Sequence, residues 1–118
     1  MNRTLELNVK GNRYVVEFPN IGRFQQIESI KQVLSKGMYS SLLNTSTISS
    51  IEALDMIDME AYFTVLVPQM VKDLKCDVMS DLGIEDYLEL KQVYQKQFVP
   101  WWNDIMKMLN PKVQKDVE

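Results

Sequence analysis

The sequence has no histidine and a single cysteine, and both scarcities restrict the chemistry that it can carry. Without histidine, zinc sites built on Cys and His ligands and the Glu-x-x-His motif of di-iron bundles are excluded. Serine nucleophiles also lack their usual activating base. Cys76 has no partner for an internal disulfide, and its neighbours are mostly acidic. We therefore expect a small, partly buried side chain at Cys76 rather than a reactive thiol.

Long apolar runs and nucleotide-binding motifs are missing as well. No apolar stretch approaches the roughly 20 residues that span a bilayer, which argues against a membrane protein. Neither GxxxxGK[ST] nor GxGxxG occurs, so no cofactor-binding loop is predicted. Carboxylates cluster within 52–60 and 81–89, but acidic residues near helix starts are stabilised by the helix dipole. We predict no catalytic, cofactor-binding or metal-ligating residue.

Positive charge is scarce in the second part of the chain. The net charge is −3, yet residues 1–50 carry six basic and three acidic residues, and residues 51–118 carry seven and thirteen. No dense basic stripe is present, so nucleic acid is not an expected partner. The two halves can attract each other within one chain or between copies. The alternative is that these charges are ordinary solvated surface charge.

The length and composition indicate one globular domain. The chain has 118 residues, of which 46% are hydrophobic and 25% charged. The patterns predict an α+β fold, with an antiparallel hairpin over 1–18 and a mostly α-helical body over 20–109. Four to five helices are expected in that body, and residues 110–118 are expected to form a flexible tail.

Period-two alternation predicts the hairpin. The apolar strand positions are Leu5, Leu7, Val9, Tyr14, Val16 and Phe18. Gly11 and Asn12 lie between the two runs, and both tolerate the positive φ that a tight hairpin turn requires. A two-stranded hairpin is marginally stable on its own. Its apolar face must therefore cover a helix or join strands from another subunit, for which an unpaired edge is a ready site.

Capping residues and prolines divide the helical body. Asn20 is the expected N-cap of the first helix and Gly37 its C-cap. The second long helix opens with a predicted capping box at Ser49–Glu52. Its apolar face then changes, which predicts a break near Asp58. Pro68 lies opposite the next apolar stripe, so a gentle bend is expected there.

The last helix, expected over 84–109, has the most regular apolar spacing in the chain, with Pro100 on its polar side. Together with the hairpin and the earlier helices it defines a predicted core. The predicted core residues are Leu7, Tyr14, Val16, Phe24, Ile27, Ile30, Leu34, Phe63, Leu66, Met70, Tyr94, Phe98 and Ile105.

Eight methionines and the aromatic residues suggest protein binding, because Met adapts to irregular partner surfaces. Trp101 and Trp102 are adjacent on a helix and cannot both face the core fully. One of them is expected at a groove or subunit contact, where tryptophan is enriched. The predicted partner-binding residues are Trp101, Trp102, Tyr87, Met106, Leu5 and Val9. Plain core packing is the alternative role for these side chains.

The stretch LELNVKGNRYVVEFPNIGRFQQIESIKQVL contains a strand, a Gly-centred turn (Lys10-Gly11-Asn12), a second strand and a helix. This order resembles the N-terminal part of small tail assembly chaperones of tailed bacteriophages, over 30 of the 118 residues. The resemblance implies a non-enzymatic protein in the host cytoplasm that binds the tape measure protein or another virion protein and forms homo-oligomers. The alternatives are a structural component of the virion (capsid, connector or tail) and a small regulatory or ligand-binding domain.

Overall fold

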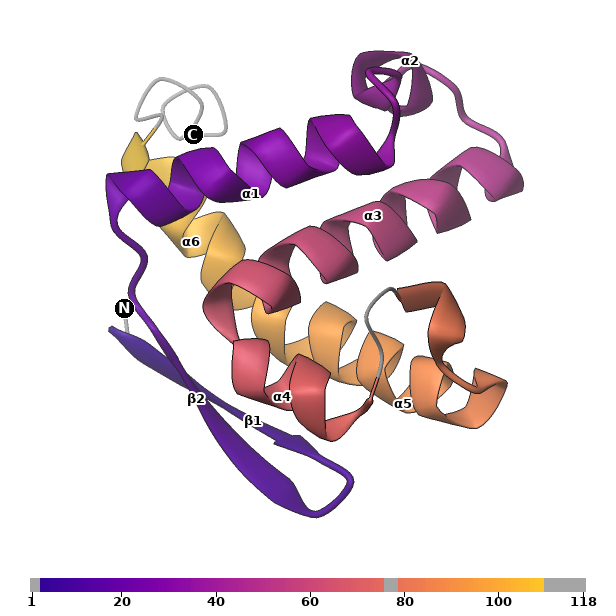
Figure 1. Cartoon of the computed structure of the whole chain (residues 1–118). Coiled ribbons are helices and arrows are strands. Elements are labelled where there is room, and N and C mark those ends of the chain that lie inside the picture. Colours follow the sequence, from indigo (N-terminus) through magenta and orange to yellow (C-terminus); the bar gives the residue numbers. More distant parts are fainter. Residues whose placement is uncertain (1–2, 76–78, 110–118) are drawn as a thin grey trace.

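The computed structural model describes residues 3–75 and 79–109. Strands β1 (Thr4–Val9) and β2 (Asn12–Glu17) form an antiparallel hairpin, and a helical body follows, which confirms the α+β fold class. The helices are α1 (Ile21–Leu34), α2 (Tyr39–Leu43), α3 (Ile48–Leu66), α4 (Pro68–Asp73), α5 (Ile84–Val93) and α6 (Val99–Leu109). Figure 1 shows the hairpin at one end of the molecule, next to α4 and α5.

The hairpin turn lies one residue earlier than the sequence predicts. Lys10 and Gly11 have φ of 52° and 79°, and positive φ at both central residues is the signature of a type I′ turn. Asn12, expected in the turn, instead pairs with Val9 in the ladder. The observed register places all the buried strand residues on one face of the hairpin. Burial therefore favours this register over the one that a turn at Gly11 and Asn12 would give. Those residues are Leu7, Val9, Tyr14 and Val16.

The apolar face of the hairpin covers helices, as one of the two predicted arrangements requires. At the turn, the backbone N–H of Lys10 donates to Glu89 Oε2 at 2.8 Å, and Lys10 Nζ lies 3.1 Å from Asp86 Oδ2. Further along β2, the Tyr14 hydroxyl donates to Asp73 Oδ2 at 2.7 Å. These contacts attach the hairpin to α5 and α4, which follow it by more than fifty residues in the sequence.

Both ends of α1 are capped. Asn20 is the N-cap, as predicted, because its Oδ1 accepts from Arg23 N at 2.8 Å. At the other end Lys36 adopts a positive φ of 54°, and Gly37 N donates to Gln32 O at 2.8 Å. This is a Schellman arrangement in which Lys36, rather than the predicted Gly37, holds the first left-handed position.

Helix α3 starts earlier and continues further than the sequence predicts. Thr47 is its N-cap and accepts from Ser50 N at 3.2 Å, so the capping box placed at Ser49–Glu52 is wrong. The break expected near Asp58 is also wrong, because α3 is uninterrupted through that residue. The apolar face changes because α3 contacts α1 and α2 along one part and the aromatic rings of the last helical run along another.

The two internal prolines have different effects. Val67 leaves the helical region (φ −136°, ψ 58°) and Pro68 begins α4, so the predicted gentle bend is in fact a break. Pro100 lies within a continuous helical run, on its exposed side as predicted. A π-helical turn, Tyr94–Phe98, precedes it, and Val99 N–H donates to Tyr94 O. The wider turn leads into α6, where the proline ring would otherwise crowd the preceding carbonyl groups.

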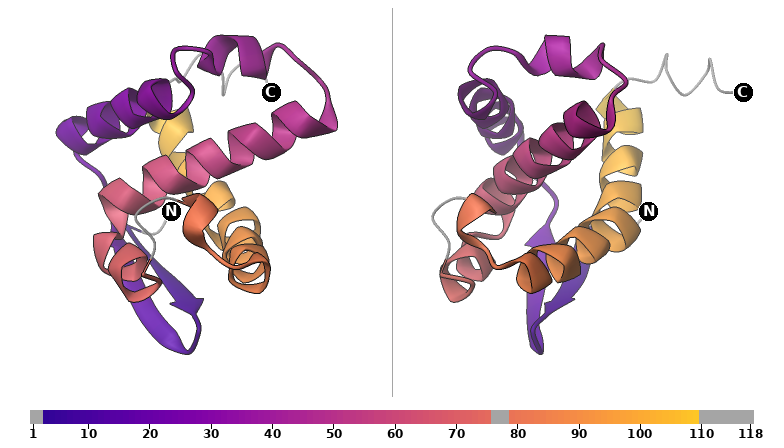
Figure 2. Two further views of the ribbon diagram at one scale, coloured as in Figure 1. Left: turned by 45° about the vertical axis from the view of Figure 1, so that its right-hand side comes forward. Right: turned by 90° about the vertical axis from the view of Figure 1, so that its right-hand side faces the viewer.

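The core lies between the hairpin and the helices. Figure 2 shows the ribbons of α3 and of the α5–α6 run above the hairpin. Ten of the thirteen predicted core residues are buried. The other three, Phe24, Ile30 and Leu34, all lie on α1 and are half-buried, because α1 is at the margin of the body. None of the described helices is long and apolar enough to cross a membrane. The predicted roles of Cys76 and of the tail over 110–118 fall outside the described residues.

Candidate functional site

An apolar groove of about 430 Å³ lies between the start of α1 and the end of α6. Its volume is within the roughly 300–1,000 Å³ that binding sites commonly occupy. Solvent reaches three of its apolar side chains: Ile21 is 61% exposed, Met108 57% and Leu109 43%. The lining residues are Phe18, Pro19, Asn20, Ile21, Phe24, Ile105, Met108 and Leu109.

The chain reversal between β2 and α1 forms one wall of this groove. Pro19 has no N–H to donate to a ladder, and Asn20 then caps α1, so Ile21 falls in the first helical turn. The floor is supported from the core, because the Phe24 ring stacks on Trp102 with centroids 6.4 Å apart. The Arg3 guanidinium lies 4.0 Å from the centre of the Phe18 ring, a cation–π contact beside the wall.

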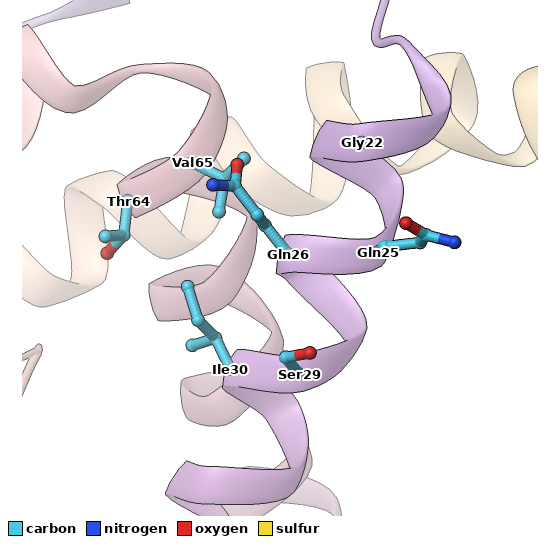
Figure 3. Close-up of a pocket in the computed structure, with 7 residues that line it drawn as sticks. All are labelled: Gly22, Gln25, Gln26, Ser29, Ile30, Thr64 and Val65. Atoms are coloured by element: carbon cyan, nitrogen blue, oxygen red, sulfur yellow. The ribbon is translucent and has the colours of Figure 1, made fainter.

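A second, more open hollow of about 560 Å³ lies between α1 and α3. Figure 3 shows Gln26 and Ile30 directed toward α3, whereas Gln25 points away from it. The lining is uncharged and consists of Gly22, Gln25, Gln26, Ser29, Ile30, Thr64 and Val65. Amide and hydroxyl groups of this kind form hydrogen bonds but supply no acid, base or strong nucleophile at neutral pH.

The most unusual polar group in the body is Lys31, which is only 6% exposed. Its Nζ donates to the Tyr62 hydroxyl at 2.7 Å and lies 3.8 Å from carboxylate oxygens of both Asp58 and Glu28. The Tyr39 hydroxyl donates to Asp58 Oδ1 at 2.7 Å. We call Lys31, Tyr39, Asp58 and Tyr62 the Lys31 cluster. It connects α1 and α2 to α3.

Burial dominates the electrostatics of the Lys31 cluster. It raises the pKa of Asp58, and the Tyr39 hydrogen bond and the Lys31 charge offset part of that rise. Burial also raises the pKa of Tyr39 and of Tyr62, so both phenols stay neutral at physiological pH. The groups are engaged with one another, which makes this a structural network. The sequence signal for it was Lys31 itself, which follows Ile27 by four residues on the apolar stripe.

Some of the carboxylates singled out in the sequence, Glu52 and Asp55 among them, contact lysines. Lys91 Nζ lies 2.7 Å from Glu52 Oε2 and 3.9 Å from Asp55 Oδ2, which links α5 to α3. The hydrogen bond to Glu52 raises the pKa of Lys91, and burial raises the pKa of Asp55. Within residues 3–75 and 79–109, no group of three or more Cys, Asp or Glu side chains could hold a metal ion.

The expectation that one tryptophan lies at the surface is wrong. Trp101 and Trp102 are 6% and 5% exposed. The Trp102 ring stacks on Phe98 at 5.7 Å and also faces Phe24 of α1, whereas Trp101 meets Phe98 edge-on at 6.0 Å. Helix α6 is enclosed on more than one side, so two adjacent side chains are both covered. Val9 is buried too, at 2% exposed, and these three residues present no binding surface.

The other three predicted partner-binding residues, Leu5, Tyr87 and Met106, are half-buried against the core. The Tyr87 hydroxyl is buried without a hydrogen-bond partner, and burial raises its pKa. None of the six predicted residues lines the apolar groove. The sequence prediction of partner-binding residues therefore missed the groove. The one local sequence feature that pointed to it was the apolar pair Met108 and Leu109 at the end of the last helix.

No family model matches the chain, and no curated protein or solved structure matches it. Function therefore has to be inferred from the groove, the Lys31 cluster and the hairpin themselves.

Proposed function

We propose that this chain is a non-enzymatic assembly protein that binds a partner protein through its apolar groove. The observation that carries the proposal is the exposure of Ile21, Met108 and Leu109 in a groove whose other apolar side chains, among them Phe24 and Ile105, are half-buried or buried. Contiguous exposed apolar side chains of this kind commonly mark interaction sites. The Lys31 cluster and the lysine–carboxylate contacts engage their charged groups with one another and offer no competing reactive site.

The occupant that suits this groove is an amphipathic helix with acidic residues beside its apolar anchors. Helix-in-groove recognition uses a few apolar side chains at helical spacing. One basic group lies beside the groove: the Arg3 guanidinium, 4.0 Å from the centre of the Phe18 ring. Acidic residues on the partner would therefore speed association and set its orientation.

The resemblance of residues 5–34 to tail assembly chaperones supports a more specific role. In that role the partner is a tape measure protein or another virion protein, and binding takes place in the host cytoplasm before the particle is complete. Self-association belongs to the same proposal. The alternative role, a structural component of the virion, differs in one measurable respect: the chain would remain in finished particles.

The test uses charged substitutions inside and outside the groove. Ile21→Asp and Met108→Asp place a carboxylate among the groove side chains, and Val33→Asp, at a position 75% exposed on α1, is the matched control. A partner is first identified by mass spectrometry of complexes from producing cells and is then purified. We expect the groove variants to bind it at least about tenfold more weakly, since a desolvated charge costs more than 1.4 kcal/mol.

Circular dichroism of each variant must match the wild type for the comparison to hold. Equal binding by the groove variants and the control would overturn the proposal. So would a wild-type chain that binds no protein and turns over a small molecule. Stoichiometric recovery of the chain in purified particles would replace the chaperone role with the structural one.

A further inference from the structure

The outer edge of β2 has backbone groups without a strand partner. In a two-residue hairpin the closing pair, Val9 and Asn12, is hydrogen-bonded, and such pairs then alternate along the ladder. The N–H and C=O groups of residues 13, 15 and 17 therefore point away from β1. Within the described residues the sheet contains only β1 and β2, so no strand takes up these groups.

The side chains of the same three residues lie on the outward face of the hairpin. Arg13, Val15 and Glu17 are all exposed, and Val15 is 51% exposed although it is apolar. Both views in Figure 2 show the hairpin at one extremity of the molecule, where a second strand could approach. An edge with backbone donors and acceptors of this kind is a template for pairing with another chain.

We propose that two copies of this chain join through their β2 edges, antiparallel, about a two-fold axis at Val15. The result is a four-stranded sheet in the order β1, β2, partner β2, partner β1. In this register Val15 lies opposite the partner's Val15, and Arg13 lies opposite the partner's Glu17. In this register residues 13, 15 and 17 lie opposite residues 17, 15 and 13 of the partner. All of these residues point their N–H and C=O groups outward, so each pair can form hydrogen bonds.

Charge complementarity identifies a second copy as the occupant. The two-fold axis repeats the pairing, so Glu17 also lies opposite the partner's Arg13, and the interface is isologous. Arg13 Nε lies 2.9 Å from Glu6 Oε1, and a guanidinium group has further N–H donors that can reach a second carboxylate. Within its own hairpin Glu17 lies opposite Thr4, which carries no charge.

The edge of β1 is a poorer site for the same symmetric pairing. Its outward residues are Thr4, Glu6 and Asn8, and an equivalent axis would place Glu6 opposite the partner's Glu6. Like charges directly opposite each other are destabilising in a sheet. The strand also packs on α5 and on the π-helical turn, more extensively than β2 packs on any helix.

This inference rests on the self-association in the proposed function, but it uses a surface separate from the apolar groove. The test is sedimentation equilibrium of the full chain over a range of concentrations. Arg13→Glu and Glu17→Arg each create two like-charge pairs across the axis. We expect either variant to raise the dimer dissociation constant by at least about tenfold, since each cross-strand charge pair changes from attractive to repulsive. The double variant R13E/E17R restores both pairs and with them the dimer.

Two further variants test the register itself. Val15→Pro removes an N–H that points outward, so it blocks the edge without removing a hydrogen bond from the hairpin. Val15→Cys, with Cys76→Ser, places two thiols across the axis at a Cα separation of about 5.5 Å, which permits a disulfide. Val33→Cys in the same background is the control that stays uncrosslinked.

A wild-type chain that is monomeric at every concentration overturns the inference. A dimer that withstands both single charge variants, or that fails to crosslink through Val15→Cys, overturns the proposed interface. Partner binding by the groove is measured separately on the same variants. If the edge variants are monomeric and still bind the partner, self-association and partner binding are independent. If only the groove variants fail, the edge is unaffected.

Discussion

At the residue scale, Lys31 shows how a charged side chain is accommodated in the body. Burying an ammonium group is costly unless hydrogen bonds and opposite charges compensate. Here one hydrogen bond donated to the Tyr62 hydroxyl and two carboxylates at 3.8 Å provide that compensation. Removing one member of such a cluster leaves the others without compensation, so the effect of a substitution should depend on the protonation of Asp58.

Lys31→Met tests this coupling. The substitution removes the charge that offsets the raised pKa of Asp58. An acid whose pKa is raised in the folded state binds more protons folded than unfolded, so stability falls as pH rises through the folded pKa. We expect the free energy of unfolding at pH 7.5 to drop by about 1–3 kcal/mol. The loss should be smaller at pH 4.5, where Asp58 is more fully protonated.

Urea denaturation at the two pH values measures the effect, with Lys96→Met at an exposed position as the control. A loss in Lys31→Met that is the same at both pH values would show that Asp58 is not coupled to Lys31.

At the scale of elements, local backbone conformation determines how the hairpin and α1 form. Gly11 occupies a left-handed position in the turn, with φ of 79°. Gly22 lies in the first turn of α1 with an ordinary helical conformation. The same chemical change at the two positions should therefore have opposite effects on stability.

Gly11→Ala should lower the free energy of unfolding by about 1 kcal/mol, because a side chain at positive φ is strained. Gly22→Ala should raise it by about 0.5 kcal/mol, because alanine favours a helix and loses less backbone entropy. A Cβ at Gly22 would meet only Asn20 Oδ1, at an ordinary 3.5 Å. Thermal denaturation of both variants provides the measurement. Changes of the same sign would contradict the turn assignment.

At the scale of the whole molecule, Phe98 is the point where the aromatic side chains meet. It is fully buried on the π-helical turn. Rings from α3, from its own turn and from α6 surround it, with centroids 5.1–6.0 Å away. Its neighbours are Tyr62, Phe63, Tyr94, Trp101 and Trp102. One side chain therefore joins elements that are distant in sequence.

Phe98→Ala should destabilise the chain by about 3–5 kcal/mol, through lost burial and the cavity that remains. That is a large part of the roughly 5–15 kcal/mol typical of a domain. Phe98→Leu retains most of the volume and should cost about 1–1.5 kcal/mol. Urea unfolding followed by Trp101 and Trp102 fluorescence measures both, with exposed Val33→Ala as the control. Equal losses for the Ala and Leu variants would argue against a cavity as the cause.

The sequence by itself determined the features that depend on short-range chemistry. Strand alternation located the hairpin, Asn20 identified the start of α1, and helical spacing identified most of the core. These predictions are correct because backbone preferences and the periodic spacing of side chains depend on residues that are close in sequence. The one-residue error at Lys10 and Gly11 arose because the ladder register, set by burial on the helices, decided between adjacent turn positions.

Only the tertiary structure decided what each apolar or charged side chain faces. The apolar stripe of α3 changes because its neighbours change, so no break is needed at Asp58. Trp101 and Trp102 are both buried because several elements enclose α6. Lys31 is tolerated in the interior because Asp58 and Tyr62 of α3 lie beside its ammonium group. The groove forms where two helix ends meet from opposite parts of the chain. Burial depends on residues far away in sequence, and local periodicity carries no information about them.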